Sequence, residues 1–334
     1  MTATRREVAV FGGGLALLIL ASALHLMQGA LPLSPAEVVQ ALRGEGGAQA
    51  AAVMMQSRLP RLLAGVLSGA AFAMAGVLLQ GVLLNDLVSP ATLGVNAGAF
   101  AASVVAAVAF PSLGRILGTE VAFIGGMAAA ALVFAASGGV SAAPVRIILA
   151  GVAVTFVFSA IAAVLQLFFE QQTAGLFFWG SGSLLQFGWQ RVARATPRFA
   201  LGVVLGLVVS GFSQVLQLGE ETARARGQRV ERVRVAGSLT GVLLAAAGIS
   251  MSGPIGFLGL AVPHLLRLMG IRRQRARFLA AGIWGATLLI VADAGTRLLF
   301  SGTQEIPVGL VTTIVGAPVL IVLVSRARRA GGRP

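Results

Sequence analysis

Residues 58–80 read RLPRLLAGVLSGAAFAMAGVLLQ, and after Arg61 this stretch carries no charged side chain. A run of about 20 apolar residues is long enough to cross a bilayer as an α-helix. Gly65, Gly69 and Ala73 recur at four-residue spacing, which places them on one face of such a helix. Small residues on one face allow membrane helices to approach closely. The stretch therefore predicts a transmembrane helix whose small face packs inside a bundle.

The rest of the chain has the same apolar character. Of its 334 residues, 57% are hydrophobic and 11% are charged, and the mean hydropathy is +0.91. A soluble domain has about a quarter of its residues charged, so this composition excludes a water-soluble enzyme. Further apolar stretches lie at about 8–27, 91–110, 117–137, 145–169, 195–216, 235–252, 254–270, 276–300 and 306–325. We expect one all-α membrane domain over residues 1–334 with about ten transmembrane helices. The stretch at 254–270 is short and begins directly after Gly253.

The placement of the 25 basic residues, all of them arginines, predicts the orientation. Cytoplasmic loops of membrane proteins carry an excess of positive charge. Arginines cluster at residues 5–6, 224–234, 272–277 and 326–333. We therefore expect a multi-pass protein of a bacterial inner membrane with ten spans and both termini in the cytoplasm, although eight spans would satisfy the termini equally. The membrane also explains the net charge of +14 more simply than nucleic acid does.

The first apolar stretch has a second interpretation. Ala21-Ser22-Ala23 has the small-x-small form of a signal-peptide cleavage site. The apolar run is longer than a usual signal core, and further apolar stretches follow it. We therefore expect a retained span.

Several kinds of chemistry are missing from the sequence. With no cysteine there is no disulfide or thiolate metal site, and with no lysine there is no G-x-x-x-x-G-K-[ST] loop for nucleotides. The two histidines, His25 and His264, have no acid cluster near them in sequence, so we expect no metal and no cofactor in this chain. Serine, histidine and acid form no recognisable catalytic set, which argues against an intramembrane hydrolase.

An ion-gradient-driven secondary transporter is one class of function that an all-helical membrane chain leaves open. Secondary transporters usually show intramembrane acids or inverted repeats. Asp293 is the only acid well inside a predicted span, and no internal repeat is evident.

Eight segments together carry a resemblance to a known family. They are RLPR leading into GVLSGAAFAMAGVLLQ (58–80), SPATLGVNAGA (89–99), RIILAGVAV (146–154), FFWGSGSLLQFGW (177–189), LGEETARARG (218–227), GPIGFLGLAVPHLLR (253–267), ADAGTRLLF (292–300) and EIPVGLVTTIVGAP (305–318). With these segments the chain resembles the FecCD family, the permeases of cobalamin, heme and ferric-siderophore importers of the type II ABC class. They occur in the right order over nearly the whole chain. One turn departs from the family, which usually has Asn-Pro-Leu-Ala where this chain has Asn85-Asp86-Leu87-Val88.

The resemblance implies a type II ABC importer permease fold and a set of partners. These are a second copy of the permease, two cytoplasmic ATPase subunits that bind ATP and Mg²⁺, and a periplasmic substrate-binding protein. The translocation path would lie between the two permeases. The implied cargo is an iron chelate or related cofactor, with siderophore first, heme second and cobalamin third.

The cytoplasmic segment 218–234 resembles the family's coupling region, two short helices that sit in a cleft of the ATPase. The acids fall near the start of a short helix and arginines further along, which suits the helix dipole, and Gly227 is a plausible stop. The candidate coupling residues are Leu218, Gly219, Glu220, Glu221, Ala223 and Gly227. The alternative is an ordinary basic loop in contact with anionic lipid.

Arg58, Arg61 and Arg297 lie on the expected outer side, against the positive-inside trend. The resemblance implies that they dock glutamates of the binding protein, and the guanidinium fork suits carboxylates. The alternatives are contact with lipid phosphate and, for Arg297, pairing with Asp293 one turn earlier. Trp179 and Trp189 flank an outer loop and are typical of interfacial anchors.

Pro263, His264 and Arg267 form the remaining candidate group. A lone histidine among apolar residues is more often a packing residue than a ligand. Arg267, one turn later, can extend to the cytoplasmic interface. We expect a structural group near the surface that contacts the ATPase.

Overall fold

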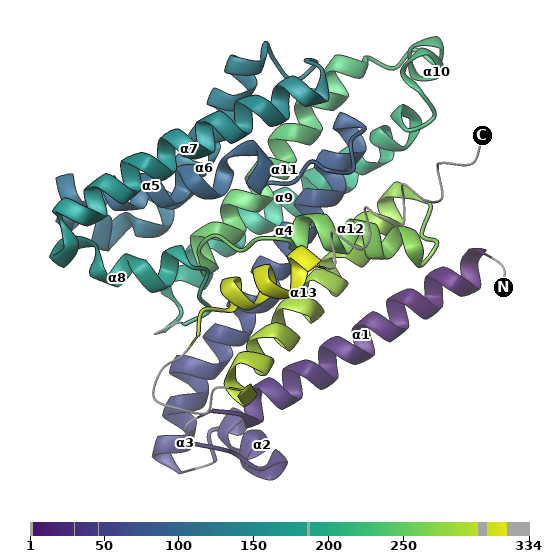
Figure 1. Cartoon of the computed structure of the whole chain (residues 1–334). Helices are drawn as coiled ribbons and strands as arrows, with labels where there is room; N and C mark the ends of the chain where they lie inside the picture. The colour runs from purple at the N-terminus through teal and green to yellow at the C-terminus, as the bar shows by residue number, and fades with distance from the viewer. Residues whose placement is uncertain (1–2, 30, 46, 186–187, 300–305, 319–334) are drawn as a thin grey trace.

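The computed structural model describes residues 3–29, 31–45, 47–185, 188–299 and 306–318, and within these ranges the regular structure is helical, with no strand (Figure 1). The helices are α1 Ala3–Met27, α2 Pro35–Arg43, α3 Ala48–Val53, α4 Leu59–Leu83, α5 Val95–Ala109, α6 Pro111–Ser137, α7 Pro144–Phe168, α8 Glu170–Gly180, α9 Gln190–Leu216, α10 Glu220–Ala225, α11 Val230–Ser252, α12 Leu258–Leu268, α13 Gln274–Leu299 and the helix Val308–Pro318. A π-helical turn, Met54–Arg58, and a 3₁₀ turn, Ala91–Leu93, precede α4 and α5.

Seven of these helices are long and apolar enough to cross a membrane, and three shorter apolar helices accompany them. Each corresponds to one of the ten predicted stretches, which confirms an all-α membrane protein with about ten membrane helices. The last stretch is described only as far as Pro318. Glu305 and the C-terminal arginines lie outside the described residues.

The stretch predicted at 254–270 is not a full helical span. α12 has 11 residues, about 17 Å of helix, which is little more than half of a hydrocarbon core of roughly 30 Å. The preceding residues 253–257 are non-helical and buried or half-buried, and Phe257 has a φ of +67°. Irregular backbone is tolerated at membrane depth when protein covers it. This crossing is therefore part irregular chain and part helix.

α4 forms the centre of the bundle and packs against α13, α11, α12 and α9. Its small residues make this close packing possible. A Cβ on Gly69 would overlap the backbone of Gly285, and a Cβ on Gly76 would overlap the backbone of Gly259. The predicted role of the small-residue face, packing inside the bundle, is confirmed for Gly69.

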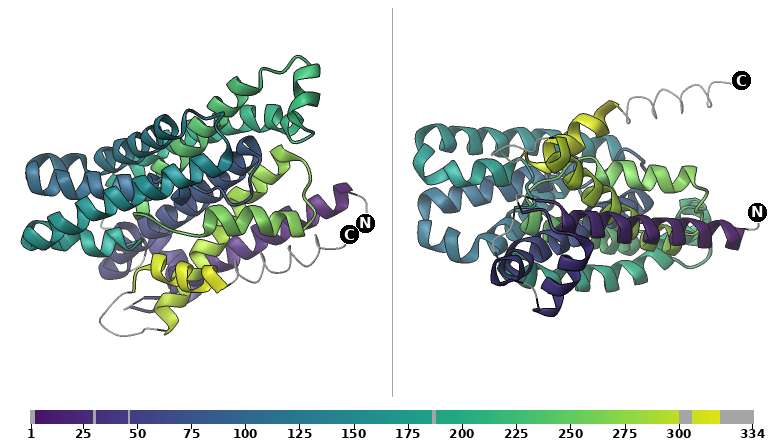
Figure 2. Two further views of the ribbon diagram at one scale, coloured as in Figure 1. Left: turned by 45° about the horizontal axis from the view of Figure 1, so that its top comes forward. Right: turned by 90° about the horizontal axis from the view of Figure 1, so that it is seen from below.

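The periphery of the bundle exposes apolar side chains. α1 lies along α13, and α7 presents Leu149, Phe156 and Leu167 to the outside (Figure 2). In a membrane protein such faces contact lipid. Because lipid tails are as apolar as these side chains, no hydrophobic effect favours their burial inside the protein.

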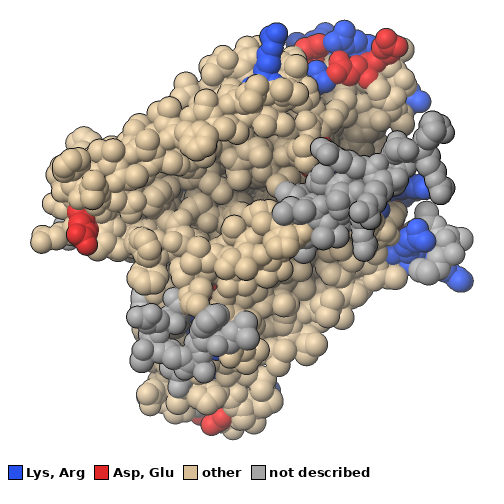
Figure 3. Space-filling model, in the orientation of Figure 1, with Lys and Arg blue, Asp and Glu red and all other residues tan. Residues whose placement is uncertain are grey.

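On the face that Figure 3 shows, charged side chains gather at the ends of the molecule and leave a belt without charged side chains between them. We call the two ends the α10 end, with α10 and the start of α1, and the α8 end, with α2, α3 and α8 (Figure 1). Arg6 lies against Gly270, so the start of the chain and the segment 271–277 share the α10 end. Three arginine groups predicted to share one membrane side, at 5–6, 224–234 and 272–277, thus lie together.

At the α8 end, α2 is a short helix with a well-formed amino terminus. The Ser34 hydroxyl and backbone N–H both face the Glu37 carboxylate at 2.7 Å, and the Glu37 N–H donates back to the hydroxyl. This capping box fixes the first turn. The same bonds, the backbone one first, lower the pKa of Glu37.

Candidate functional site

Asp293 on α13 is buried in the bundle towards the α8 end, and Arg61 of α4 holds it with two hydrogen bonds. Arg61 Nε donates to Oδ2 at 3.0 Å and Nη2 donates to Oδ1 at 2.9 Å. Asp293 is 1% exposed and Arg61 is 7% exposed. This bidentate geometry is the strongest form of arginine–carboxylate pairing.

Two further groups complete the cluster around this carboxylate. His25 Nε2 of α1 lies 2.9 Å from Oδ2, and Arg297 Nη2 donates to the same oxygen at 3.0 Å. Arg297 also donates to the His25 carbonyl at 3.4 Å. Asp293 therefore joins α1, α4 and α13. The interpretation of Arg297 as a partner of Asp293 is confirmed.

Arg58 lies beside this cluster and fastens the end of α1. It donates to the Leu26 carbonyl at 2.6 Å and to the Leu31 carbonyl, and it is 4% exposed. The Leu26 carbonyl is among the last four of α1, which a helix end leaves without an intrahelical partner, and the Leu31 carbonyl lies in the chain that follows the helix. Arg58 thus ties the end of α1 and the chain after it to the start of α4.

The structure brings Arg58, Arg61 and Arg297 together, as their shared predicted role requires, but it engages all three within the chain. Their docking to a binding protein stays a prediction. A partner carboxylate would have to compete with Asp293 for Arg61 and Arg297, or with the carbonyls at the end of α1 for Arg58.

α10 is the core of the predicted coupling segment. Gly219, with a φ of +108°, precedes it, and Ala223 is buried against Leu216 and Val230. Gly227, with a φ of +76°, lies just past its end, where a left-handed residue commonly stops a helix. The position of the predicted stop thus agrees with the structure.

Ion pairs tie α10 to the start of α11. Glu220 pairs with Arg234, and Arg224 lies 2.9 Å from Glu231 and 3.8 Å from Glu220. Leu218 and Glu221 are exposed. Where the resemblance implied two short helices, the described residues contain one, because residues 217–219 form a turn and α11 begins at Val230.

Pro263 is buried on α12, His264 is half-buried, and Arg267 reaches across to the turn that follows α4. Arg267 pairs with Asp86 and donates to the Gln80 side chain at 3.4 Å. Asp86 is the acid by which this turn departs from the family pattern. Asp86 thus has an ion-pair partner, Arg267, on α12, and the sequence did not reveal this contact.

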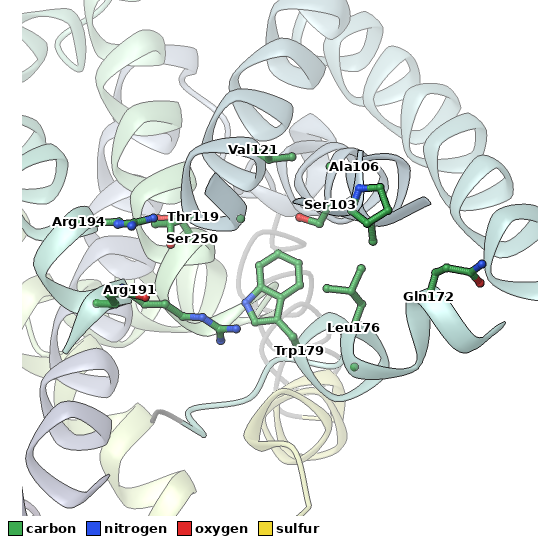
Figure 4. Close-up of a pocket in the computed structure, with 15 residues that line it drawn as sticks. Ser103, Ala106, Thr119, Val121, Gln172, Leu176, Trp179, Arg191, Arg194 and Ser250 are labelled. Atoms are coloured by element: carbon green, nitrogen blue, oxygen red, sulfur yellow. The ribbon is translucent and has the colours of Figure 1, made fainter. Parts of the chain in front are cut away.

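A cavity of about 440 Å³ lies between α5, α6, α8 and α9 (Figure 4). Trp179 forms one wall, and the Arg191 guanidinium points toward its ring in the figure. Trp179 is 8% exposed and stacks on Phe100 with ring centroids 6.4 Å apart. The prediction that it is an interfacial anchor is wrong, because the indole is inside the bundle. Trp189 is 42% exposed.

No group of three or more histidine, cysteine or acidic side chains that could hold a metal occurs among the described residues. The cluster at Asp293 contains one carboxylate and one imidazole, and the groups facing them are guanidiniums. Guanidiniums repel a cation, so the cluster is suited to structure or to anion contacts rather than to metal binding.

The sequence profile of the FecCD transport family matches residues 17–326 of this chain. The chain belongs to the FecCD transport family.

Relatives in this family cover nearly the whole chain. The Fe(3+)-citrate import system permease protein YfmD of Bacillus subtilis is 36% identical over 308 residues, 91% of each chain. The ferric enterobactin transport system permease protein FepD of Escherichia coli is 35% identical over 331 residues, 98% of each chain. The solved structure of a metal-chelate type ABC transporter in an inward-facing conformation shares 29% identity, with a TM-score of 0.81 over 95% of this chain and 99% of that one.

As a FecCD permease, the chain is the membrane subunit of an ABC importer, and a separate ATPase subunit hydrolyses ATP. It is a multi-pass membrane protein that works beside a permease partner. The predictions of family, fold class and non-enzymatic role are confirmed.

Proposed function

We propose that this FecCD permease carries a ferric chelate inward through the interface between two permease subunits, driven by ATP hydrolysis on its partner ATPase. The observation that carries the proposal is the end-to-end similarity to iron-chelate permeases together with a short helix, α10, on the surface of the arginine-rich end. Such a helix is a rigid element through which an ATPase can move the bundle.

The cargo we propose first is a ferric siderophore or citrate chelate, with heme second and cobalamin third. The relatives YfmD and FepD are named for ferric citrate and ferric enterobactin, which supports this order.

The assembly we propose contains two copies of this permease, two cytoplasmic ATPase subunits and a periplasmic binding protein. The α10 end would face the cytoplasm, because the arginine groups at 5–6, 224–234 and 272–277 share it. Leu218, Gly219, Glu220, Glu221, Ala223 and Gly227 would form the coupling surface, with Pro263, His264 and Arg267 beside it. Arg58, Arg61 and Arg297 would receive the binding protein at the α8 end.

The test is transport by the reconstituted complex. The permease and its co-purifying ATPase are placed in liposomes with the binding protein, and entry of radioactive iron is followed for citrate, catecholate and heme chelates. ATP-dependent uptake of one ferric chelate, abolished by a catalytically inactive ATPase, is the expected result. Uptake that needs no ATPase and collapses with an ionophore would identify a secondary transporter instead.

A further inference from the structure

A groove of about 780 Å³ runs between α9 and α11 near the α10 end. Its α9 wall is apolar, with Leu205, Val208 and Phe212 exposed by 40%, 53% and 55%. These residues follow each other at helical spacing and so form one stripe. The stripe continues to Val215, a length of about 15 Å, which is half the thickness of a hydrocarbon core.

The end of the groove towards α10 is strongly basic. Arg226, Arg229 and Arg232 line it, and all three are exposed. Among the residues that the structure describes, no acid lies within ion-pair distance of any of them. Their neighbours Arg224 and Arg234 differ, because each pairs with a glutamate. The basic end of the groove, which we call its mouth, therefore carries three arginines that have no acidic partner among the described residues. It adjoins the apolar wall.

Backbone groups add to this positive end. Arg229 is the residue before α11, and no side chain caps that helix. The dipole of a helix amino terminus favours a phosphate. Gln228 closes the end of the groove by donating to the Phe212 carbonyl at 2.7 Å. The basic mouth is thus held in a fixed position against the apolar stripe.

We propose that this groove binds one anionic phospholipid, with its phosphate among Arg226, Arg229 and Arg232 and an acyl chain along Leu205, Val208 and Phe212. The division into a cationic mouth and an apolar stripe one leaflet deep matches the two parts of a lipid. A soluble anion would leave the stripe uncovered, and an acidic protein surface would not fill it. Basic pockets between membrane helices are a known form of lipid site. The proposal requires a membrane protein and is independent of the cargo.

The experiment is lipid titration of the purified full-length permease in detergent, read by native mass spectrometry. The probes are phosphatidylglycerol, phosphatidylethanolamine and glycerol 3-phosphate. We expect one tightly retained phosphatidylglycerol per chain, with the other two bound more weakly. Replacing Arg226, Arg229 and Arg232 together by glutamine should weaken phosphatidylglycerol binding roughly a hundredfold, since each arginine near an anionic lipid contributes about a fivefold factor.

The matched control removes the same charge from exposed arginines at the same end, as Arg146→Gln with Arg272→Gln and Arg273→Gln, and should bind like the native chain. Val208→Trp, at an exposed position, fills the acyl stripe and should also weaken binding without removing charge. Three results would each overturn the proposal: equal binding by the triple variant and the native chain, equal loss in the control, or glycerol 3-phosphate binding as tight as that of the lipid. Retained lipid with loss of the ATPase in the triple variant would assign the arginines to the partner instead.

Discussion

Arg61 and Asp293 stand 232 positions apart in the chain and meet inside the bundle, where Arg61 Nη2 donates to Asp293 Oδ1 at 2.9 Å. The pair joins the central helix α4 to α13, and His25 brings α1 to the same carboxylate. A buried ion is tolerated only when its partners satisfy it. The cluster therefore fixes the register of three helices at one point.

Asp293→Asn should destabilise the permease strongly. The change leaves Arg61 and Arg297 buried without their carboxylate, and loss of one partner of a buried pair typically costs about 3–5 kcal/mol. The thermal midpoint in detergent should fall well below that of Asp86→Asn. Asp86 also pairs with an arginine, but its side chain is 67% exposed, and exposed pairs contribute about 0–1 kcal/mol. Equal midpoints for the two variants would contradict this difference.

Gly76→Ala should disrupt the contact between α4 and α12. The new methyl group would overlap the backbone of Gly259, which cannot move as a side-chain end can. Overpacking of this kind costs about 1–3 kcal/mol. Gly12→Ala on α1 is the matched control, because nothing lies within 4 Å of its added Cβ. The measurement is the detergent midpoint of both variants, and a Gly76→Ala protein as stable as the control would refute the proposed close contact.

The sequence predicted the membrane helices well, because a run of apolar residues long enough to span a bilayer is a local property. It also located α10 and its stop at Gly227. It overestimated α12, since residues 253–257 are apolar enough to resemble a span although their backbone is irregular. The composition of a segment predicts how favourably its side chains transfer into lipid, but it does not predict whether its backbone is helical.

Contacts between distant segments were beyond sequence reasoning. Arg297 could be matched to Asp293 because they are one helical turn apart, whereas Arg61 and His25 are more than 200 positions away from it. One signal was available in the sequence. An acid inside a span requires partners, so Asp293 indicated that buried basic side chains lie near it. Asp86 and Arg267 gave no comparable signal, because an exposed acid in a turn needs no partner.

Cysteine labelling tests the orientation, and the native chain contributes no background thiol. Gln274 would be an unsuitable probe, because it is fully buried and donates to the Val77 carbonyl at 3.0 Å. Thr222→Cys and Arg273→Cys are exposed positions at the α10 end, and Glu45→Cys is exposed at the α8 end. In intact cells an impermeant thiol reagent should label only Glu45→Cys. The reverse pattern would place the α10 end outside.

The coupling surface predicts separate effects on transport and on folding. Glu221 is exposed, so Glu221→Arg should leave the midpoint unchanged and reduce transport-coupled ATP hydrolysis. Gly227→Pro should act through geometry, because proline cannot adopt the φ of +76° and loses the N–H that donates to the Arg224 carbonyl at 2.9 Å. Glu45→Arg, an exposed acid at the other end, is the control. Normal uptake and hydrolysis in both coupling variants would remove α10 from the coupling path.

Docking of a binding protein at Arg58, Arg61 and Arg297 needs a test that keeps the Asp293 cluster satisfied. Simple reversal of Arg61 would place two acids in contact inside the bundle and cause misfolding whatever its role in docking. Arg61→Gln removes the guanidinium, leaves the Asp293 carboxylate paired with Arg297, and keeps a side-chain amide that can donate to it.

If Arg61 receives a partner carboxylate, Arg61→Gln should bind the binding protein roughly ten- to a hundredfold more weakly, which corresponds to about 1.5–3 kcal/mol for one charge-assisted contact. The measurement is affinity for the reconstituted complex at two salt concentrations, with the basal ATPase rate as the check on integrity. The association rate should also lose part of its salt dependence, because rim charges act mainly on encounter. An Arg61→Gln protein with native basal rate, native affinity and native salt dependence would leave Arg61 with a single role, holding α4 to α13 through Asp293.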